Sequence, residues 1–141
     1  MKRVIFQNMQ TPFSLHDQNI IAFEIRGDDL ILRPQAPAFV ETAPPYRALD
    51  GYLEFRDVDW DFCYAYLLDF TGNVGTFSGE KMFLKDFIAD FHNAGFSVMD
   101  ETFGYNQAKL CGYFHKSNTV KECIIEIYHL GELAYWIDSE G

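Results

Sequence analysis

Basic residues, cysteines and long apolar runs are all scarce in this chain of 141 residues. Eleven lysines and arginines stand against 21 aspartates and glutamates, so the formal net charge is −10. The resulting negative field repels the phosphates of nucleic acids and anionic membrane surfaces, and we expect neither as a partner. The same field attracts a basic protein and raises the rate of encounter with it.

The three cysteines do not form a recognisable framework. Cys63, Cys111 and Cys123 are odd in number, widely spaced and free of any C-x-x-C pair. We therefore expect buried thiols rather than disulfides or a zinc site. The apolar stretch at residues 4–6 is too short for the core of a signal peptide, and no run reaches the ~20 apolar residues of a membrane-spanning helix. These features predict a protein of the reduced cytoplasm.

Sequence motifs for catalysis and for metal or cofactor binding are missing. Neither a G-x-S-x-G elbow nor an H-E-x-x-H zinc motif occurs, and the glycines of residues 72–79 fit neither phosphate-loop spacing. The D-x-D-x-D run at residues 57–61 opens like a calcium loop. However, Phe62 and Leu68 stand where that loop needs glycine and glutamate. We expect no catalytic residue, no cofactor and no metal.

Alternating apolar residues predict strands along most of the chain. Residues 19–33 fit a hairpin with Gly27 and Asp28 in its turn. The apolar positions are odd-numbered around residues 53–55 and even-numbered at residues 60–70, so a turn is expected between them, at residues 57–59. Further strands are expected at residues 3–8, 96–103, 107–115, 119–130 and 133–138.

The last two of these strands are predicted to pair with each other. Residues 131–132 suit a two-residue hairpin turn, and strands joined by so short a turn are antiparallel neighbours. Along residues 119–130, the apolar odd-numbered positions share one face, whereas Glu122 and Glu126 lie on the other.

One helix is expected, at residues 79–93, because apolar residues recur there at helical spacing. Its apolar stripe consists of Met82, Phe83, Leu84, Phe87, Ile88 and Phe91. Ser78 suits the N-cap, and Gly95 suits the left-handed position beyond the C-terminus. We expect this stripe to lie on one face of a sheet.

Four of the five prolines lie within residues 34–50, which predicts a long loop with either an inert or a binding role. One helix among many strands predicts an α+β fold. Specifically, we expect a single domain over residues 1–141: a predominantly antiparallel, curved sheet or open sandwich of about 7–9 strands, with the 79–93 helix packed on it.

The segment SLHDQNIIAFEIRGDDLIL resembles the start of several families of small uncharacterised bacterial proteins, some of which are similar to immunity proteins that neutralise toxins. The matching residues are Leu15, His16, Asp17, Ile21, Ile25, Gly27, Asp28, Leu30 and Leu32. The resemblance implies an antiparallel α+β fold without catalysis. It assigns no site residues.

These observations together predict a non-catalytic, acidic binding protein of the cytoplasm. Its expected partner is a basic protein, in the immunity-type case a basic toxin that it inhibits. The expected contact residues are Asp57, Asp59, Trp60, Asp61 and, in the proline-rich loop, Tyr46.

Two other classes of function stay open. A small-molecule binder or enzyme would have an aromatic-lined pocket between the helix and the sheet, with His115, Tyr113 or Glu126 converging on it. A structural or assembly component would form a large homo-oligomer.

Overall fold

The computed structural model describes residues 1–7, 11–69 and 78–138. Strands take up 64% of the residues and helix 7%. The first seven strands are β1 (Lys2–Ile5), β2 (Phe13–Ser14), β3 (Asn19–Arg26), β4 (Asp29–Pro34), β5 (Phe39–Glu41), β6 (Ala48–Leu49) and β7 (Gly51–Phe55). The later elements are the 3-10 turn η1 (Trp60–Phe62), β8 (Tyr64–Asp69), β9 (Ser78–Phe83), the helix α1 (Leu84–Ala89), β10 (Ala94–Gly104), β11 (Gln107–Lys116), β12 (Thr119–Tyr128) and β13 (Leu133–Ile137).

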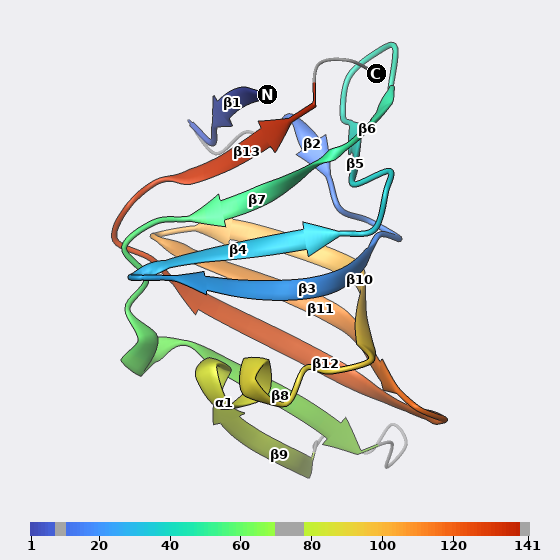
Figure 1. The fold of residues 1–141 in the computed structure, drawn as a ribbon, viewed down its shortest axis with the longest axis vertical. Helices are drawn as coiled ribbons and strands as arrows, with labels where there is room; N and C mark the ends of the chain where they lie inside the picture. Colours follow the sequence, from blue (N-terminus) through green and yellow to red (C-terminus); the bar gives the residue numbers. More distant parts are fainter. Residues whose placement is uncertain (8–10, 70–77, 139–141) are drawn as a thin grey trace.

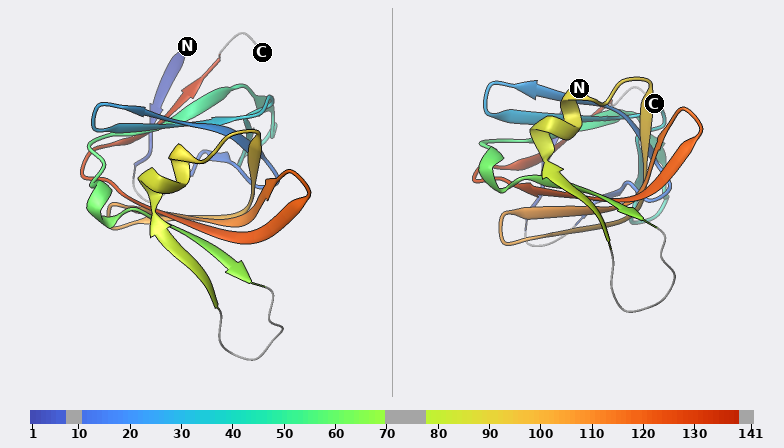
Figure 2. Two further views of the ribbon diagram at one scale, coloured as in Figure 1. Left: turned by 60° about the horizontal axis from the view of Figure 1, so that its bottom comes forward. Right: turned by 90° about the horizontal axis from the view of Figure 1, so that it is seen from below.

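Ten of these strands form one antiparallel sheet in the order β1-β13-β7-β4-β3-β10-β11-β12-β8-β9 (Figure 1). The sheet folds over where β3 meets β10, because those two strands pair through only two residues each, Ile20 with Phe96 and Asn19 with Ser97. Its two halves therefore face each other across the interior (Figure 2). The strands β2, β5 and β6 form a separate small sheet.

A single apolar core fills the space between the two halves. The half that contains β4, β7 and β13 supplies Leu30, Leu32, Leu53, Phe55 and Tyr135 to the core, and the half that contains β10, β11 and β12 supplies Val98, Leu110, Cys123, Ile125 and Ile127. The small sheet packs against one end of this core, where Phe13 and Phe39 place their rings 5.3 Å and 5.6 Å from the ring of Tyr135. Each half thus depends on the other to exclude water.

The helix α1 lies beside the two halves, on the side of the molecule that carries β8 and β9 (Figure 2). Its buried residues Leu84 and Phe87 point inward, and the ring of Phe87 lies 5.9 Å from Phe23 of β3 and 5.3 Å from Phe114 of β11. The ring of Phe91, just beyond the helix, lies 4.9 Å from Phe23. These aromatic side chains connect the two halves.

The predicted α+β class is wrong, because the protein is nearly all antiparallel sheet and its main sheet exceeds the 7–9 strands expected. The prediction of a helix over residues 79–93 is also wrong. Residues Ser78–Phe83 are the edge strand β9, which pairs with β8, and α1 covers only Leu84–Ala89. Phe83, rather than Ser78, lies at the helix N-cap, and Gly95 lies in β10.

The predicted pairing of the last two strands is wrong as well. The strand β12 pairs with β11 and β8, whereas β13 pairs with β7 and β1. Residues 129–132 therefore carry the chain from one half of the sheet to the other. The predicted hairpin at residues 19–33 is confirmed by the pairing of β3 with β4. The turn at residues 57–59 is confirmed as well, since Asp57 has a φ of 51° and η1 follows.

Two other predicted segments differ in part from the structure. The proline-rich stretch contains the short strands β5 and β6 and is therefore not one continuous loop. Residues 72–77, which hold two of the glycines discussed above, lie outside the described residues.

Candidate functional site

An open groove runs along the outer face of the sheet, where β8, β12 and β11 lie side by side and η1 closes one end. It has a volume of about 560 Å³. Its lining consists of Asp59, Phe62, Tyr64, Tyr66, Gln107, Glu126, Tyr128 and Leu130. Aromatic rings and carboxylates are therefore concentrated in one place, and we refer to this site as the aromatic groove.

Strand alternation places these side chains on the outer face. In β8 the buried Ala65 points inward, so its neighbours Tyr64 and Tyr66 point outward. In β12 the buried Ile127 points inward, and Glu126 and Tyr128 point outward. The strand register then pairs Glu126 with Tyr64 across β12 and β8. It also pairs Tyr128 with Gln107 across β12 and β11.

Large apolar side chains at the groove are exposed to solvent. Phe62 is 59% exposed and Leu130 is 56% exposed, and the ring of Phe62 lies 6.1 Å from that of Tyr128. On the opposite side, Tyr64 stacks on Phe83, which is 50% exposed, at a ring distance of 5.7 Å. Exposed apolar surface that is concentrated in a groove is typical of a binding site rather than of solvent-facing surface.

The carboxylate of Glu126 is held by neutral hydrogen-bond donors. Gln107 Nε2 donates to Glu126 Oε2 at 3.3 Å. Hydrogen bonding with the same carboxylate raises the pKa of Tyr66 to about 12, with burial and the negative charge of Glu126 as further causes. Lys109 lies opposite Glu126 in the register, but no lysine or arginine of the described residues forms an ion pair with this carboxylate. Glu126 thus keeps its charge available to a ligand.

One lysine of the chain already lies on the tyrosines of the groove. Lys81 of β9 is paired with Tyr66 in the register. Its Nζ lies 4.2 Å from the ring centre of Tyr64 and 5.6 Å from that of Tyr66. This is the geometry of a cation–π contact.

The expected aspartates lie together at the η1 end of the aromatic groove. Asp59 lines the groove, and its side chain accepts a hydrogen bond from the backbone N–H of Asp61 at 3.3 Å. The backbone N–H of Asp57 donates to Asp29 Oδ1 at 3.0 Å, which brings the β3–β4 turn with its Asp28 to the same end of the molecule. We call Asp28, Asp29, Asp57, Asp59 and Asp61 the acidic end. None of them forms an ion pair with a lysine or arginine among the described residues.

The structure places the other two expected contact residues elsewhere. Trp60 is half-buried against the core, with Lys85 Nζ 5.3 Å from its ring centre. Tyr46 is 59% exposed but belongs to the connection between β5 and β6, at the opposite end of the molecule from η1 (Figure 1). The aspartates and these two residues therefore do not form one surface.

Sequence reasoning missed the aromatic part of the groove. The even-numbered aromatic residues at positions 60–66 were visible as a strand pattern, and the shared face of Glu126 and Tyr128 was visible too. The missing information was the pairing of β8 with β12, which brings these faces together and joins residues about 60 positions apart in the sequence.

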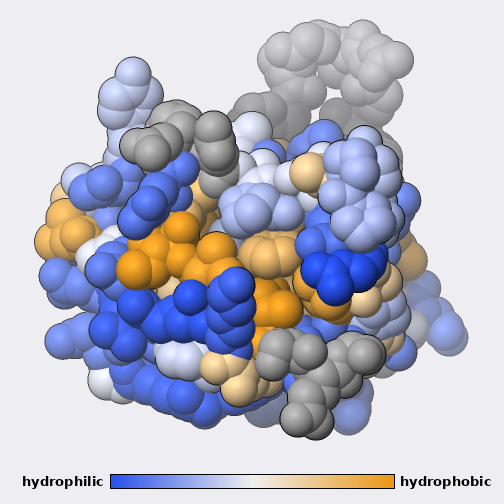
Figure 3. All heavy atoms as spheres, turned by 90° about the horizontal axis from the view of Figure 1, so that it is seen from above, coloured by the Kyte–Doolittle hydropathy of each residue, from blue (hydrophilic) through white to orange (hydrophobic). Residues whose placement is uncertain are grey.

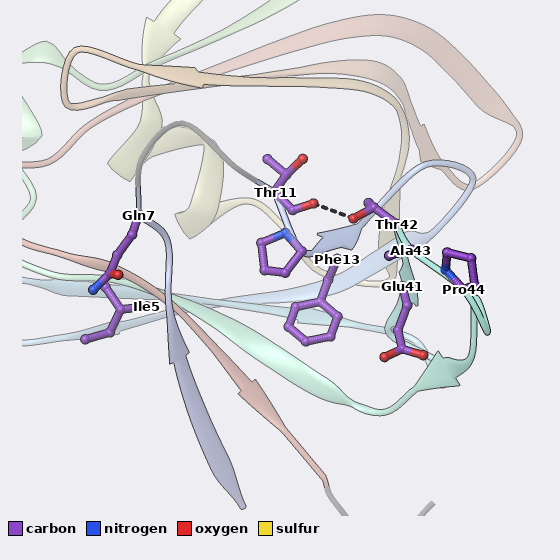
Figure 4. Close-up of a pocket in the computed structure, with 9 residues that line it drawn as sticks. Ile5, Gln7, Thr11, Phe13, Glu41, Thr42, Ala43 and Pro44 are labelled. Atoms are coloured by element: carbon purple, nitrogen blue, oxygen red, sulfur yellow. Dashed lines mark hydrogen bonds between the residues drawn. The ribbon is translucent and has the colours of Figure 1, made fainter.

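A second hollow lies at the end of the molecule that carries the small sheet and β1. Apolar side chains gather in the middle of that end, ringed by hydrophilic ones (Figure 3). The hollow has a volume of about 710 Å³, and Phe13, Ile5 and Pro44 are among its lining residues (Figure 4). Two of its polar side chains are already engaged, since Glu41 pairs with Arg47 and Thr42 Oγ1 donates to the backbone carbonyl of Thr11. Unlike the aromatic groove, this hollow pairs its carboxylate with an arginine of the same chain.

The space between helix and sheet, where the small-molecule alternative placed its pocket, is filled by the aromatic cluster of Phe23, Phe87, Phe91 and Phe114. The three residues expected to converge there do not do so. Glu126 lines the aromatic groove, Tyr113 lies elsewhere on the outer face, and His115 bonds through Nε2 to Ser97 Oγ at 2.9 Å.

The cysteines are free thiols, and burial raises the pKa of Cys63 to about 11 and that of Cys123 to about 12. In the described part of the chain, no cluster of three or more histidine, cysteine, aspartate or glutamate residues has a metal-binding arrangement. In the described residues, no helix is long and apolar enough to span a membrane.

Comparisons with known proteins add no relative. No family model matches the chain, and neither the curated proteins nor the solved structures yield a match.

Proposed function

We propose that this chain is a cytoplasmic, non-catalytic binding protein whose partner is a basic protein, bound through the aromatic groove and the adjacent acidic end. The observation that carries the proposal is the groove itself. The exposed ring of Phe62 and the half-buried rings of Tyr64, Tyr66 and Tyr128 line it. Beside them lie two carboxylates, Asp59 and Glu126, that have no cationic partner within the described residues. The free thiols suit a reduced compartment.

The chemistry of the groove fits a basic protein surface better than a neutral one. Tyrosine and tryptophan are enriched where protein interfaces are most buried, because each ring contributes a large contact area at a small cost in conformational entropy. Carboxylates beside the rings discriminate against acidic partners and attract basic ones, and the net charge of −10 extends that attraction beyond contact distance.

A narrower form of the proposal is inhibition of a basic toxin in the manner of an immunity protein. It is supported by the resemblance of residues 14–32 to the start of small uncharacterised bacterial proteins, some of which are similar to immunity proteins, and by the acidic end, which would cover a cationic substrate-binding surface. In this form the complex, rather than any reaction, is the function.

The proposal is tested with a defined probe, an eight-residue peptide of four lysines and four arginines labelled with a fluorophore. We expect the peptide to bind with an affinity that falls as salt rises, and D59N/E126Q to weaken binding by about tenfold, which corresponds to ~1.4 kcal/mol. The double variant D50N/D86N removes the same charge at two exposed positions outside the groove.

Fluorescence anisotropy gives the dissociation constants, and the control variant separates site binding from general attraction. Equal weakening in the two double variants, or no binding of the peptide by the wild-type protein, would contradict the proposal. The same pair of variants can then be used on any basic protein recovered from the source cells.

A further inference from the structure

We infer that Tyr64, Tyr66 and Glu126 form a subsite for an arginine side chain of the partner, and that Lys81 of the chain itself covers the two tyrosine rings of this subsite until the partner arrives. The inference rests on the proposed function and adds to it the identity of the group recognised and a step of displacement.

The position of Lys81 shows that these two rings accept a cation. Its Nζ lies 4.2 Å from the centre of Tyr64 and 5.6 Å from the centre of Tyr66, so both rings face the same positive charge. The electron-rich faces of tyrosine rings attract cations, including the cationic side chains of a ligand. Lys81 reaches these rings from β9, and Glu126 lies on the other side of β8, in β12. Lys81 therefore shows that the tyrosine rings of the subsite bind a cation, and a longer, planar side chain is needed to contact the rings and Glu126 together.

Lys81 holds its position over the rings weakly. It is an exposed residue of the edge strand β9, which among the described strands pairs with β8 alone. Among the described residues it forms no ion pair, although Glu126 lines the same groove as both tyrosines. An exposed cation–π contact changes an equilibrium constant by only about two- to fivefold, so displacement costs little.

An arginine can form contacts that Lys81 does not. The carboxylate of Glu126 lines the groove and accepts hydrogen bonds from Gln107 and Tyr66. A planar guanidinium donates two parallel hydrogen bonds to such a carboxylate and stacks on aromatic rings, whereas an ammonium group is a more strongly hydrated point charge. Arginine is therefore expected to bind better than lysine at this subsite.

The experiment compares two probes and three variants. The probes are eight-residue peptides in which arginine or lysine alternates with glycine, and their dissociation constants are measured by fluorescence anisotropy. We expect the wild-type protein to bind the arginine peptide at least about fivefold more tightly than the lysine peptide. We expect K81M to raise the affinity for the arginine peptide by about three- to fivefold, because the rings of Tyr64 and Tyr66 are then free of the competing lysine.

The matched control is K85M, which removes an equal charge from a lysine that lies over Trp60 rather than over the groove tyrosines. It should raise affinity by less than about twofold. The third variant, Y64L/K81M, should lose the gain seen with K81M if the emptied subsite is the cause, since Leu replaces the ring closest to the cation.

The outcomes distinguish this inference from the proposed function. Equal gains with K81M and K85M, a loss of affinity with K81M, or equal binding of the two peptides would overturn the arginine subsite. Binding that still depends on Asp59 and Glu126 would in those cases leave the proposed function standing. If neither peptide bound to the protein, both the arginine subsite and the proposed function would be contradicted.

Discussion

At the scale of single residues, the aromatic side chains divide between the two faces of the sheet. Phenylalanines such as Phe55, Phe87 and Phe96 are buried, whereas Tyr64, Tyr66 and Tyr128 lie on the outer face, where their hydroxyls reach water or a polar partner. The alternation of residues 60–66 alone could not assign these faces. Apolar residues occur at odd and even positions of β8, and a tyrosine ring suits either environment.

The link between Tyr66 and Glu126 is testable by titration. Ionising Tyr66 breaks its hydrogen bond to Glu126 and brings two negative charges together, which is why its pKa lies at about 12 rather than at the ordinary value of 10.0. We expect E126Q to shift the pKa of Tyr66 back toward 10, measured by carbon NMR of tyrosines labelled at Cζ. The exposed variant D50N should leave the titration of Tyr66 unchanged.

The same titration has a consequence for stability. Since the pKa of Tyr66 is higher in the folded than in the unfolded chain, its interaction stabilises the folded protein below pH 10, and this contribution is lost as the pH rises from about 10 to about 12. In E126Q the loss of stability over that pH range should be smaller. An unchanged Tyr66 titration in E126Q would show that the carboxylate is not its partner.

A substitution at Gly112 tests how closely the backbones of β10 and β11 approach each other. The strand β10 has a bulge between Val98 and Asp100, and a Cβ added at Gly112 of β11 would overlap the backbone carbonyl oxygen of Ser97. We expect Gly112→Ala to lower the free energy of unfolding by about 3 kcal/mol, because neither backbone can move without disturbing the core. Urea unfolding followed by circular dichroism measures the loss.

The control for Gly112 is Gly27, in the turn between β3 and β4. A Cβ there would meet none of the described atoms within 4 Å, and only its φ of 60° opposes a side chain. Gly27→Ala should therefore cost only about 1 kcal/mol. If both variants lost the same small amount, the close contact at Gly112 would not limit the fold.

At the scale of elements, local sequence patterns predicted most strands but placed the start of the helix at residue 79, whereas α1 begins at Leu84. The apolar residues of 79–93 do recur at helical spacing, but the first part of the segment pairs with β8, in a register that joins Met82 to Ala65. Hydrogen bonding to a neighbouring strand outweighs a difference in intrinsic propensity of less than about 1 kcal/mol per residue. The segment therefore changes from strand to helix at Phe83, and the left-handed residue that follows the helix is Asn93 rather than Gly95.

The short connection after β12 shows a second limit of sequence reasoning. A two-residue turn between apolar runs is the usual sign of a hairpin, yet residues 129–132 lead β13 to β7 instead. The buried His129 pairs with Val58 in an isolated bridge, and its Nδ1 bonds to the carbonyl oxygen of Gly131 at 2.8 Å. These contacts are long-range or specific to the fold, so local spacing could not reveal the crossover. The aromatic groove likewise depends on a long-range pairing, that of β8 with β12, which local spacing does not reveal.

The helix α1 is short, but it closes the core. Phe87 is 4% exposed and its ring touches those of Phe23, Phe91 and Phe114. We expect Phe87→Ala to lower the free energy of unfolding by about 3–5 kcal/mol, through lost burial and a residual cavity. The neighbouring exposed variant Asp86→Ala should change stability by less than about 0.5 kcal/mol. A loss below 1 kcal/mol for Phe87→Ala in urea unfolding would mean that α1 only lies on the surface.

At the scale of the whole molecule, charge is distributed unevenly. Within the first half of the sheet and the small sheet, glutamates pair with arginines, as in Glu24 with Arg33, Glu41 with Arg47 and Glu54 with Arg56. The acidic end lacks such pairs in the described part of the chain, and the aromatic groove adjoins it. Carboxylates without an ion-pair partner are therefore concentrated next to the groove, which is an arrangement that steers a basic partner toward a specific contact.

The folded-over sheet also predicts how the protein unfolds. Because the halves join at β3 and β10 through only two residue pairs but share one apolar core, neither half can exclude water from its apolar face without the other. The two halves are therefore expected to unfold together.

The two tryptophans report on the two halves separately. Trp136 of β13 stacks on Tyr52 of β7, and Trp60 of η1 packs beside the β8 half. We expect W60F and W136F each to show the same urea midpoint by fluorescence of the remaining tryptophan and by far-ultraviolet circular dichroism. Comparing probes within one variant removes any effect of the substitution on stability. Fluorescence that changes ahead of the dichroism in either variant would mean that one half unfolds alone, and that residues 1–141 do not form a single domain.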